Sequence, residues 1–229
     1  MASAHSPRII TDGLVLCLDA GNTKSYPGSG TSWSDLSGQG NNGTLTNGPT
    51  YSSDNGGAIV FDGSNDYVSI SNMGLSSNTL EGWIKSYDGN QGGGTDIVSV
   101  LGKYSIIAAE KYTYIGFFGG DLTFRIDKGV RSSSHLNVHT VSYTANQWYH
   151  VALTYNSSNG SAVAYINGSN VGSTTAATGI VFDNTPNSIA RAGNGNHFNG
   201  AVSVTKIYNK ALTATEVQQN YNALKGRYQ

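Results

Sequence analysis

The chain has 229 residues, a formal net charge of -1 and only 12% charged residues. No stretch clusters Lys or Arg, which argues against nucleic-acid binding, because sequence-independent binding depends on basic patches. The low charge content argues against long solvent-facing helices, and plentiful β-branched and aromatic residues argue against disorder. The 30 glycines indicate many tight turns, and the length suits one large all-β domain.

The amino-terminal stretch "MASAHSPRIITDG" lacks the apolar core of a signal peptide, so no secretory signal is expected. No segment approaches the roughly 20 apolar residues that span a membrane, so no membrane partner is expected either. Residues 1–12 are expected to form an N-terminal arm, and residues 13–229 a single domain. The only cysteine, Cys17, lies in the apolar run "LVLCL", which indicates a buried, inert thiol.

Apolar and β-branched runs separated by Gly, Asn, Asp and Ser clusters predict an antiparallel sandwich or barrel. "GLVLCLDA" (13–20) is apolar on both faces, as a central strand would be. The loop that follows, 21–53, is glycine-rich and expected to be irregular. "AIVF" (58–61) and "YVSIS" (67–71) are predicted strands joined by the short hairpin loop "DGSND". Further strands are predicted at "NTLEGWIK", "DIVSVL", "TYIGFF" and "LTFRID", whereas the stretch between the last of these and Trp148 is hard to interpret.

Strand signals continue in the last third of the chain. "VALTY" and "AVAYI" flank the turn sequence "NSSNGS", and Asn167-Gly168 then predicts a two-residue hairpin turn, because both residues tolerate positive φ. "SIARAG" and "GAVSVTKIYN" complete the predicted strands. One helix is predicted in "ALTATEVQQNYNAL", where Thr213 and Glu216 have the spacing of a capping box. Its apolar residues, at near-helical spacing, should pack on the sandwich.

Several stretches, taken in chain order, resemble the successive signatures of one family: "GLVLCLDAGNTKSYPGSGTSWSDLSGQGNNGTLTNGPTY", "IVFDGSNDYVSI", "NTLEGWIK", "NQWYHVALTYN", "AVAYINGSNVG" and "FNGAVSVTKIYNKALTATEVQQNY". They look like the laminin-G-like jelly-roll domains of the concanavalin A-like lectin/glucanase superfamily, over about residues 13–226. The resemblance implies an all-β fold, a two-sheet antiparallel jelly-roll sandwich, to which the sequence adds one short C-terminal helix.

The glucanases of this superfamily carry paired carboxylates on one strand, and retaining hydrolysis needs two carboxyl groups about 5 Å apart. This chain has only three glutamates, Glu81, Glu110 and Glu216. Glu216 belongs to the capping box, and neither of the others has an acidic residue two positions away. No Gly-x-Ser-x-Gly elbow occurs. We therefore expect no enzyme, although carboxylates from different strands could still converge.

The "DGSND" turn is the candidate metal site, because alternate oxygen-bearing side chains can hold Ca²⁺. Many laminin-G-like domains bind one Ca²⁺, so the resemblance implies Asp62 and Asp66 as ligands. Asp19 or Asn22 would lie nearby if the first strand pairs as expected. The alternative is that these aspartates form Asx turns that close a hairpin.

Candidate ligand-binding residues are the aromatic and imidazole side chains of the loops, since sugar sites combine aromatic faces with polar groups. They are Tyr26, Trp33, Tyr51, Tyr87 and His197. The alternative for each is packing of the long loop onto the sheet.

The stretch "NQWYHVALTYN" (146–156) is either a site or a strand that builds the fold. Nothing nucleophilic stands beside His150 in the sequence. We therefore expect His150 to be a hydrogen-bonded sheet residue and not a catalytic base.

Two functions are consistent with these observations. The leading hypothesis is a non-catalytic virion structural protein, a capsid decoration or other surface module of a phage. The resemblance is to versions of the domain found in tailed-phage structural proteins, and no export signal is present. Its partners would be capsid or other virion proteins, with homo-oligomers and glycans as further partners, and its location the virion surface. The alternative is a free carbohydrate-binding lectin or adhesion module.

Overall fold

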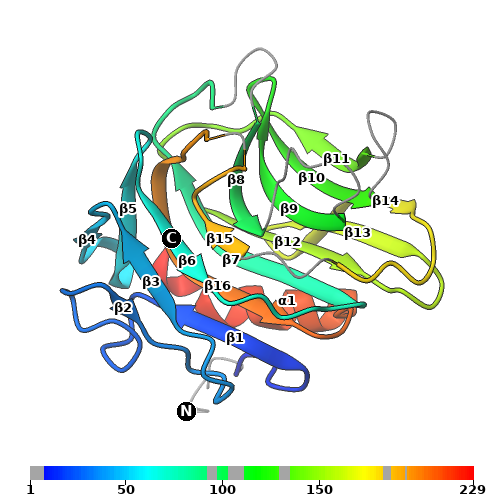
Figure 1. The fold of residues 1–229 in the computed structure, drawn as a ribbon, viewed down its shortest axis with the longest axis horizontal. Helices are drawn as coiled ribbons and strands as arrows, with labels where there is room; N and C mark the ends of the chain where they lie inside the picture. The colour runs from blue at the N-terminus through cyan, green and yellow to red at the C-terminus, as the bar shows by residue number, and fades with distance from the viewer. Residues whose placement is uncertain (1–7, 92–96, 103–110, 129–134, 183–186, 194) are drawn as a thin grey trace, which may run out of the picture.

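The computed structural model describes residues 8–91, 97–102, 111–128, 135–182, 187–193 and 195–229. These residues form two antiparallel sheets packed face to face, which confirms the predicted jelly-roll sandwich (Figure 1). The first sheet runs in spatial order β14 (Ser169–Thr175), β13 (Ser161–Ile166), β12 (Tyr149–Tyr155), β7 (Asn78–Ser86), β16 (Asn199–Tyr208), β5 (Ala58–Asp62) and β4 (Thr50–Ser52), with β1 (Leu14–Asp19) also paired to β16. The second runs β11 (His135–Val141), β10 (Asp121–Lys128), β9 (Lys111–Phe118), β8 (Ile97–Gly102), β15 (Asn187–Ile189), β6 (Tyr67–Ile70), β3 (Gly43–Thr46) and β2 (Ser32–Trp33).

The main core lies between the sheets, because alternate residues of each strand point inward. Leu80 and Ile84 of β7 enter it from the first sheet, and Phe117 and Phe124 enter it from the second. Burial of such side chains stabilises a fold by about 1.5–3 kcal/mol each. The position of β7 in the middle of its sheet explains why its other face is buried as well.

That outer face of the first sheet is covered by α1 (Ala214–Leu224) and a following turn of 3₁₀ helix, η2 (Lys225–Arg227). Figure 1 shows α1 in red alongside β16 and β1. Its predicted capping box is confirmed: the Thr213 backbone N–H donates to Glu216 Oε2 (2.8 Å), and the Glu216 N–H donates to Thr213 Oγ1 (3.3 Å). Among the described residues, no helix is long and apolar enough to cross a membrane.

The two predicted hairpins after Trp148 are confirmed. β12 pairs with β13, and β13 pairs with β14 through the two-residue turn at Asn167 and Gly168. Both turn residues have positive φ, 51° and 77°. Asn167 tolerates this region better than most residues, and Gly168 has no Cβ to clash.

The prediction that "DGSND" closes a hairpin is wrong, and this error matters for the site. β5 pairs with β16 and β4 in the first sheet, whereas β6 pairs with β15 and β3 in the second. The loop from Asp62 to Asp66 therefore carries the chain from one sheet to the other. A short turn between two apolar runs is compatible with either connection, because only long-range pairing decides between them.

Three further expectations are corrected. The segment 21–53 is not irregular throughout, since β2, β3 and β4 lie within it or at its end. β1 is not a central strand: its only strand partner among the described residues is β16, and its other edge is covered by the loop around Asp35, which accepts from the Cys17 backbone N–H at 2.8 Å. β11 occupies the stretch before Trp148 that the pattern left unassigned.

The N-terminal segment is attached to α1 where it is described. The Ile10 backbone N–H donates to Asn220 Oδ1 (2.7 Å), and Gln219 Nε2 donates to the Arg8 carbonyl (2.7 Å). Residues 1–7 of the predicted arm lie outside the described residues.

Candidate functional site

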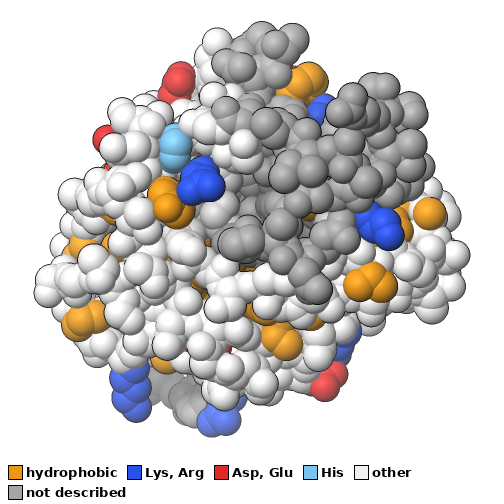
Figure 2. All heavy atoms as spheres, in the orientation of Figure 1, with side chains coloured by type: hydrophobic (Ala, Val, Ile, Leu, Met, Phe, Trp, Pro, Cys, Tyr) orange, Lys and Arg blue, Asp and Glu red, His pale blue; other side chains and the backbone are white. Residues whose placement is uncertain are grey.

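An open hollow of about 390 Å³ lies at one end of the sandwich, and we call it the loop hollow. Three loops form it: the crossover after β5, the turn after β7 and the segment before β16. Its lining is mostly polar and consists of Asp62, Gly63, Asp88, Asn90, Gln91, Val98, Gly195, Asn196, His197 and Asn199. On the face drawn in Figure 2, charged side chains are few and scattered among uncharged polar groups.

Strand register brings these loops together. β16 lies between β5 and β7, with Asn199 opposite Asp62 and Gly200 opposite Ser86. Because both neighbours run antiparallel to β16, its first residues meet the last residues of β5 and β7 at the same end. The loop hollow is the space above that junction.

Asp62 is held in place by the turn that it begins. Its Oδ1 accepts from the Ser64 backbone N–H at 2.8 Å, and from that of Asn65 at 3.4 Å. These backbone hydrogen bonds, that of Ser64 above all, lower the pKa of Asp62, so the carboxylate is charged at neutral pH. The structure thus contains the Asx turn weighed as the alternative, although it closes a crossover and not a hairpin.

The turn after β7 is fixed by Tyr143 and Gln91. The Tyr143 hydroxyl donates to the Asp88 carbonyl (2.5 Å) and accepts from the Gln91 backbone N–H (3.0 Å). The Gln91 side chain is 5% exposed and exchanges two long hydrogen bonds with the backbone of Asn199. This wall of the loop hollow is therefore positioned before any ligand arrives, which reduces the entropy lost on binding.

His197 lies at the rim beside Tyr67, with ring centroids 6.4 Å apart. Burial, followed by the nearby Arg191 guanidinium, lowers the pKa of His197, so the imidazole is neutral at pH 7. The Arg191 guanidinium itself stacks on the Tyr67 ring, 4.5 Å from its centroid. A neutral imidazole can both donate and accept a hydrogen bond.

Several polar groups of the loop hollow keep capacity for a ligand. Among the described residues, the side-chain amides of Asn90 and Asn199 make no hydrogen bond. In the same part of the chain, the Oδ2 atoms of Asp62 and Asp88 accept no hydrogen bond from a side chain of the loop hollow. Carboxylates accept, and amides both donate and accept. This set matches the hydroxyl groups of a polyol.

Carboxylates do converge here, since Asp62 and Asp88 reach one hollow from different elements. Glycoside hydrolysis needs one carboxyl group with a raised pKa to act as the acid. The pKa of Asp62 is lowered by its backbone hydrogen bonds, which suits an acceptor and not a proton donor.

None of the four candidate aromatic residues lines the loop hollow. Trp33 is fully buried in the core, so it offers no ring face to a ligand, and Tyr26 is 3% exposed with its hydroxyl bonded to the Gly30 carbonyl (2.8 Å). Tyr51 is 37% exposed and packs against Tyr26 at 5.6 Å between ring centroids. Tyr87 is half-buried, with the Lys85 ammonium 5.3 Å from its ring centroid. Packing of the long loop onto the sheet, the alternative to ligand binding, therefore explains the positions of Tyr26 and Trp33.

The candidate calcium ligands are not brought into one cluster. Asp19 pairs with Val204 of β16, whereas Asp62 pairs with Asn199, about 16 Å away along the strand at about 3.3 Å per residue. Asp19 binds the Arg227 guanidinium through both carboxylate oxygens, at 2.7 and 3.0 Å. Asn22 caps a local turn by accepting from the Lys24 backbone N–H (3.0 Å).

Within the described part of the chain, no three His, Cys, Asp or Glu side chains are grouped as metal ligands would be. Asp66 is 4% exposed, and its Oδ2 accepts from the Asp62 backbone N–H at 3.2 Å. Burial raises the pKa of Asp66. Calcium binding at Asp62 and Asp66 stays a prediction.

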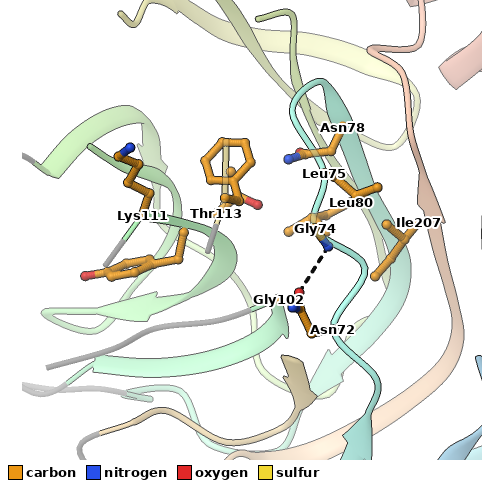
Figure 3. Close-up of a pocket in the computed structure, with 11 residues that line it drawn as sticks. Asn72, Gly74, Leu75, Asn78, Leu80, Gly102, Lys111, Thr113 and Ile207 are labelled. Carbon is orange, nitrogen blue, oxygen red and sulfur yellow. Dashed lines mark hydrogen bonds between the residues drawn. The ribbon is translucent and has the colours of Figure 1, made fainter. Parts of the chain in front are cut away.

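A second, mostly closed cavity of about 30 Å³ lies near Asn78 at the start of β7 (Figure 3). It has room for about two water molecules, which is too small for a sugar ring. Asn78 is 2% exposed, and its Oδ1 has no hydrogen-bond partner among the described residues. Figure 3 also shows the Asn72 side chain accepting from the Gly74 backbone N–H (3.1 Å).

A third polar site, the buried cluster, lies where α1 packs on the sheet. It consists of Glu81, His150 and Lys206 of the sheet and Asn220 of α1. All four are at most 1% exposed. Glu81 Oε1 pairs with the Lys206 ammonium and lies 3.1 Å from His150 Nε2, and Glu81 Oε2 accepts from Asn220 Nδ2 at 2.8 Å. Burial would raise the pKa of Glu81, but Lys206 and His150 outweigh it and bring the pKa to about 2.

His150 is a sheet residue, as predicted. Its backbone N–H donates to Asn167 Oδ1 at 3.0 Å, and burial lowers the pKa of its imidazole although Glu81 opposes this. Tyr221 stacks over the neighbouring Trp83 with ring centroids 5.7 Å apart. The buried cluster is sealed from solvent, so it can hold α1 on the sheet but cannot meet a substrate.

The sequence analysis missed most of the loop hollow, namely Asp88, Asn90, Gln91, Asn196 and Asn199. "YDGNQ" and "NGNHFN" both carry turn signals next to strands. Those signals could have marked the two segments as loops. Only the pairing of β7 with β16 shows that they meet.

The fold and the loop hollow define a lectin-type jelly roll. A family model described as "Concanavalin A-like lectin/glucanases superfamily" matches residues 62–218, and the chain belongs to this family. The search of curated proteins found no match.

Solved structures with a similar fold include domain 4 of AbnA, a GH43 extracellular arabinanase from Geobacillus stearothermophilus, in complex with arabinotriose. It is 20% identical, with a TM-score of 0.70 over 91% of this chain and 98% of that one. The binding domain of Paraclostridial Mosquitocidal Protein 1 is 21% identical, with a TM-score of 0.70 over 93% of this chain and 52% of that one. The binding domain of botulinum neurotoxin DC in complex with SialylT is 16% identical, with a TM-score of 0.71 over 94% and 52%.

The chain thus spans about half the length of the toxin binding domains that it resembles. At these identities the likeness concerns the fold alone. Two of the similar structures named are binding domains, and a sialidase from Trypanosoma rangeli also shares the fold, with a TM-score of 0.65 and 14% identity over 94% of this chain and 33% of that one.

Proposed function

We propose that this chain is a non-catalytic carbohydrate-binding module and that the loop hollow holds the glycan. The observation that carries the proposal is the convergence of Asp62, Asp88, Asn90 and Asn199 on one open hollow, with polar atoms left over for a ligand. Sugar hydroxyls are donors and acceptors at once, so they can satisfy carboxylates and amides together. His197 at the rim adds a neutral imidazole that can donate or accept.

Two features of the similar structures agree with this proposal. The arabinanase domain was solved with arabinotriose, and one toxin binding domain was solved with SialylT. Both are separate proteins at low identity, so they support a glycan-binding use of the fold and do not identify the sugar.

A glycan array with the purified chain tests the proposal, followed by titration calorimetry on the sugars that bind. Asn90→Ala and Asn199→Ala should each weaken binding by about 2- to 10-fold, since each removes a hydrogen bond worth about 0.5–1.5 kcal/mol. Asn170→Ala is the matched control, because Asn170 is exposed on β14, away from the loop hollow, and should leave affinity unchanged. Flat signals across neutral and acidic glycans would refute the proposal.

The same array, repeated with EDTA, tests the calcium prediction. A loss of binding that added Ca²⁺ restores would support a metal at Asp62 and Asp66. Unchanged binding would remove calcium from the account of this site.

Placement on a virion stays a prediction from the sequence, together with capsid partners and a virion-surface location. None of the similar structures named above is described as a virion protein. A glycan-binding module carried in many copies on a particle would gain avidity, so both functions can coexist. Mass spectrometry of purified virions would test the placement, and absence of this chain from them would exclude it.

A further inference from the structure

Among the described residues, the charged side chains that line the loop hollow are all carboxylates. Asp62 and Asp88 each contribute a carboxylate to the lining, and the Asp62 carboxylate accepts from the Ser64 backbone N–H at 2.8 Å. Among the described residues that line the loop hollow, none is Lys or Arg. The neighbouring sequence segments 92–96 and 194 contain no Lys or Arg either.

Two groups beside the loop hollow could carry positive charge, namely His197 in its lining and Arg191, which pairs with His197 across a β-bridge. The pKa of His197 is lowered by burial and by Arg191, so its imidazole is neutral at pH 7. The Arg191 guanidinium is stacked on the Tyr67 ring and does not line the loop hollow. A ligand in the loop hollow therefore meets carboxylate acceptors and neutral amides.

From this arrangement we infer that the loop hollow selects neutral glycans and rejects acidic ones such as sialylated or uronic-acid sugars. The inference rests on the proposed function and adds the class of sugar. A sugar hydroxyl donates to a carboxylate, whereas a sugar carboxylate is repelled by it and leaves both anions unpaired. Like charges about 4–6 Å apart at a partly solvated surface cost enough to weaken binding by about tenfold or more.

The test compares glycans that carry a carboxylate with matched glycans that lack it. Sialylated glycans are compared on one array with the same glycans after enzymatic desialylation, and galactose oligomers are compared with galacturonate oligomers. The wild-type chain should bind the neutral member of any pair it recognises about tenfold or more tightly. Raised ionic strength should reduce that difference, because salt screens exposed charges.

A double variant, Asp62→Asn with Asp88→Asn, tests the cause. Asparagine keeps an Oδ1 that can accept from the backbone N–H groups of Ser64 and Asn90, so both turns should persist. The variant should bind the neutral and acidic members of each pair with affinities within about threefold of each other, as expected once repulsion is removed. Asp54→Asn is the control, because Asp54 is exposed outside the loop hollow and its substitution removes one carboxylate at a distance from the site.

The outcomes separate the inference from the function on which it rests. Preference for acidic glycans by the wild-type chain would overturn the inference and leave glycan binding intact. Equal preference in the wild type and the double variant would also overturn it. No binding to any glycan would overturn both.

Discussion

Removing the charge of Glu81 should destabilise the fold by about 3–5 kcal/mol. Glu81 and Lys206 are 0% and 1% exposed, and Glu81→Gln leaves the Lys206 ammonium buried without its counter-charge. Loss of one partner of a buried pair typically costs that amount. The gap between the usual Glu pKa of 4.5 and about 2 gives a similar figure, about 3 kcal/mol at about 1.4 kcal/mol per pH unit.

Urea unfolding at pH 7, followed by tryptophan fluorescence, measures this loss. The matched control is Asp12→Asn, which removes one partner of the Lys210 pair where Asp12 is 83% exposed. Exposed pairs contribute about 0–1 kcal/mol, so the control should unfold close to wild type. A loss below about 1 kcal/mol for Glu81→Gln would contradict the buried-pair argument.

The dependence on pH follows from the same pKa. Because the pKa of Glu81 is lower in the folded chain than in the unfolded one, its contribution is complete above about pH 4.5 and is lost as the pH falls towards 2. Glu81→Gln should therefore show a flatter stability profile than wild type across that window. Adding Lys206→Met to Glu81→Gln removes both charges. The double variant should regain at least about 2 kcal/mol of the free energy of unfolding that Glu81→Gln loses. Additive losses in this double variant would refute the pairing.

Two further predictions concern Gly102 and Thr213, and urea unfolding measures both. Gly102→Ala should cost more than about 3 kcal/mol or prevent folding, because φ is +87° and a Cβ would lie 2.4 Å from the Thr113 carbonyl oxygen. Its control, Gly38→Ala, has a φ of +86° and open space, so it should cost only about 1–2 kcal/mol; equal losses would contradict the clash. Thr213→Ala should cost about 1 kcal/mol through loss of the capping box, and no loss would show that packing alone holds α1.

Turns and the helix start could be predicted from the sequence because their signals are local, whereas the two-sheet jelly roll was implied by the family resemblance. The turn at Asn167 and Gly168 and the cap at Thr213 and Glu216 each follow from residues a few positions apart. The crossover after Asp62 could not be predicted, because apolar runs on both sides of a short turn suit a hairpin equally well. Which sheet a strand joins depends on partners far along the chain, such as Asn199 for Asp62.

For the same reason, only two residues of the loop hollow were candidates from the sequence. Asp62 and His197 were candidates on their chemistry, and the structure brings both to one place. Trp33 was a candidate on chemistry as well, yet it is fully buried. A loop position in the sequence does not reveal whether an aromatic ring faces solvent or the core, since that depends on how the loop packs.

Among the described residues, the carboxyl group with the largest pKa shift, that of Glu81, does not mark the candidate site. Strongly shifted pKa values often cluster where chemistry occurs, and Glu81 beside His150 would attract attention on that basis. Access decides against it: α1 contributes Asn220 to the buried cluster and seals Glu81, Lys206 and His150 beneath it. Asp62 has a pKa lowered mainly by one backbone N–H but reaches solvent in the loop hollow, so it can meet a ligand. In this fold the outer sheet face serves stability, and the strand ends, where loops leave polar atoms open, are the proposed place of binding.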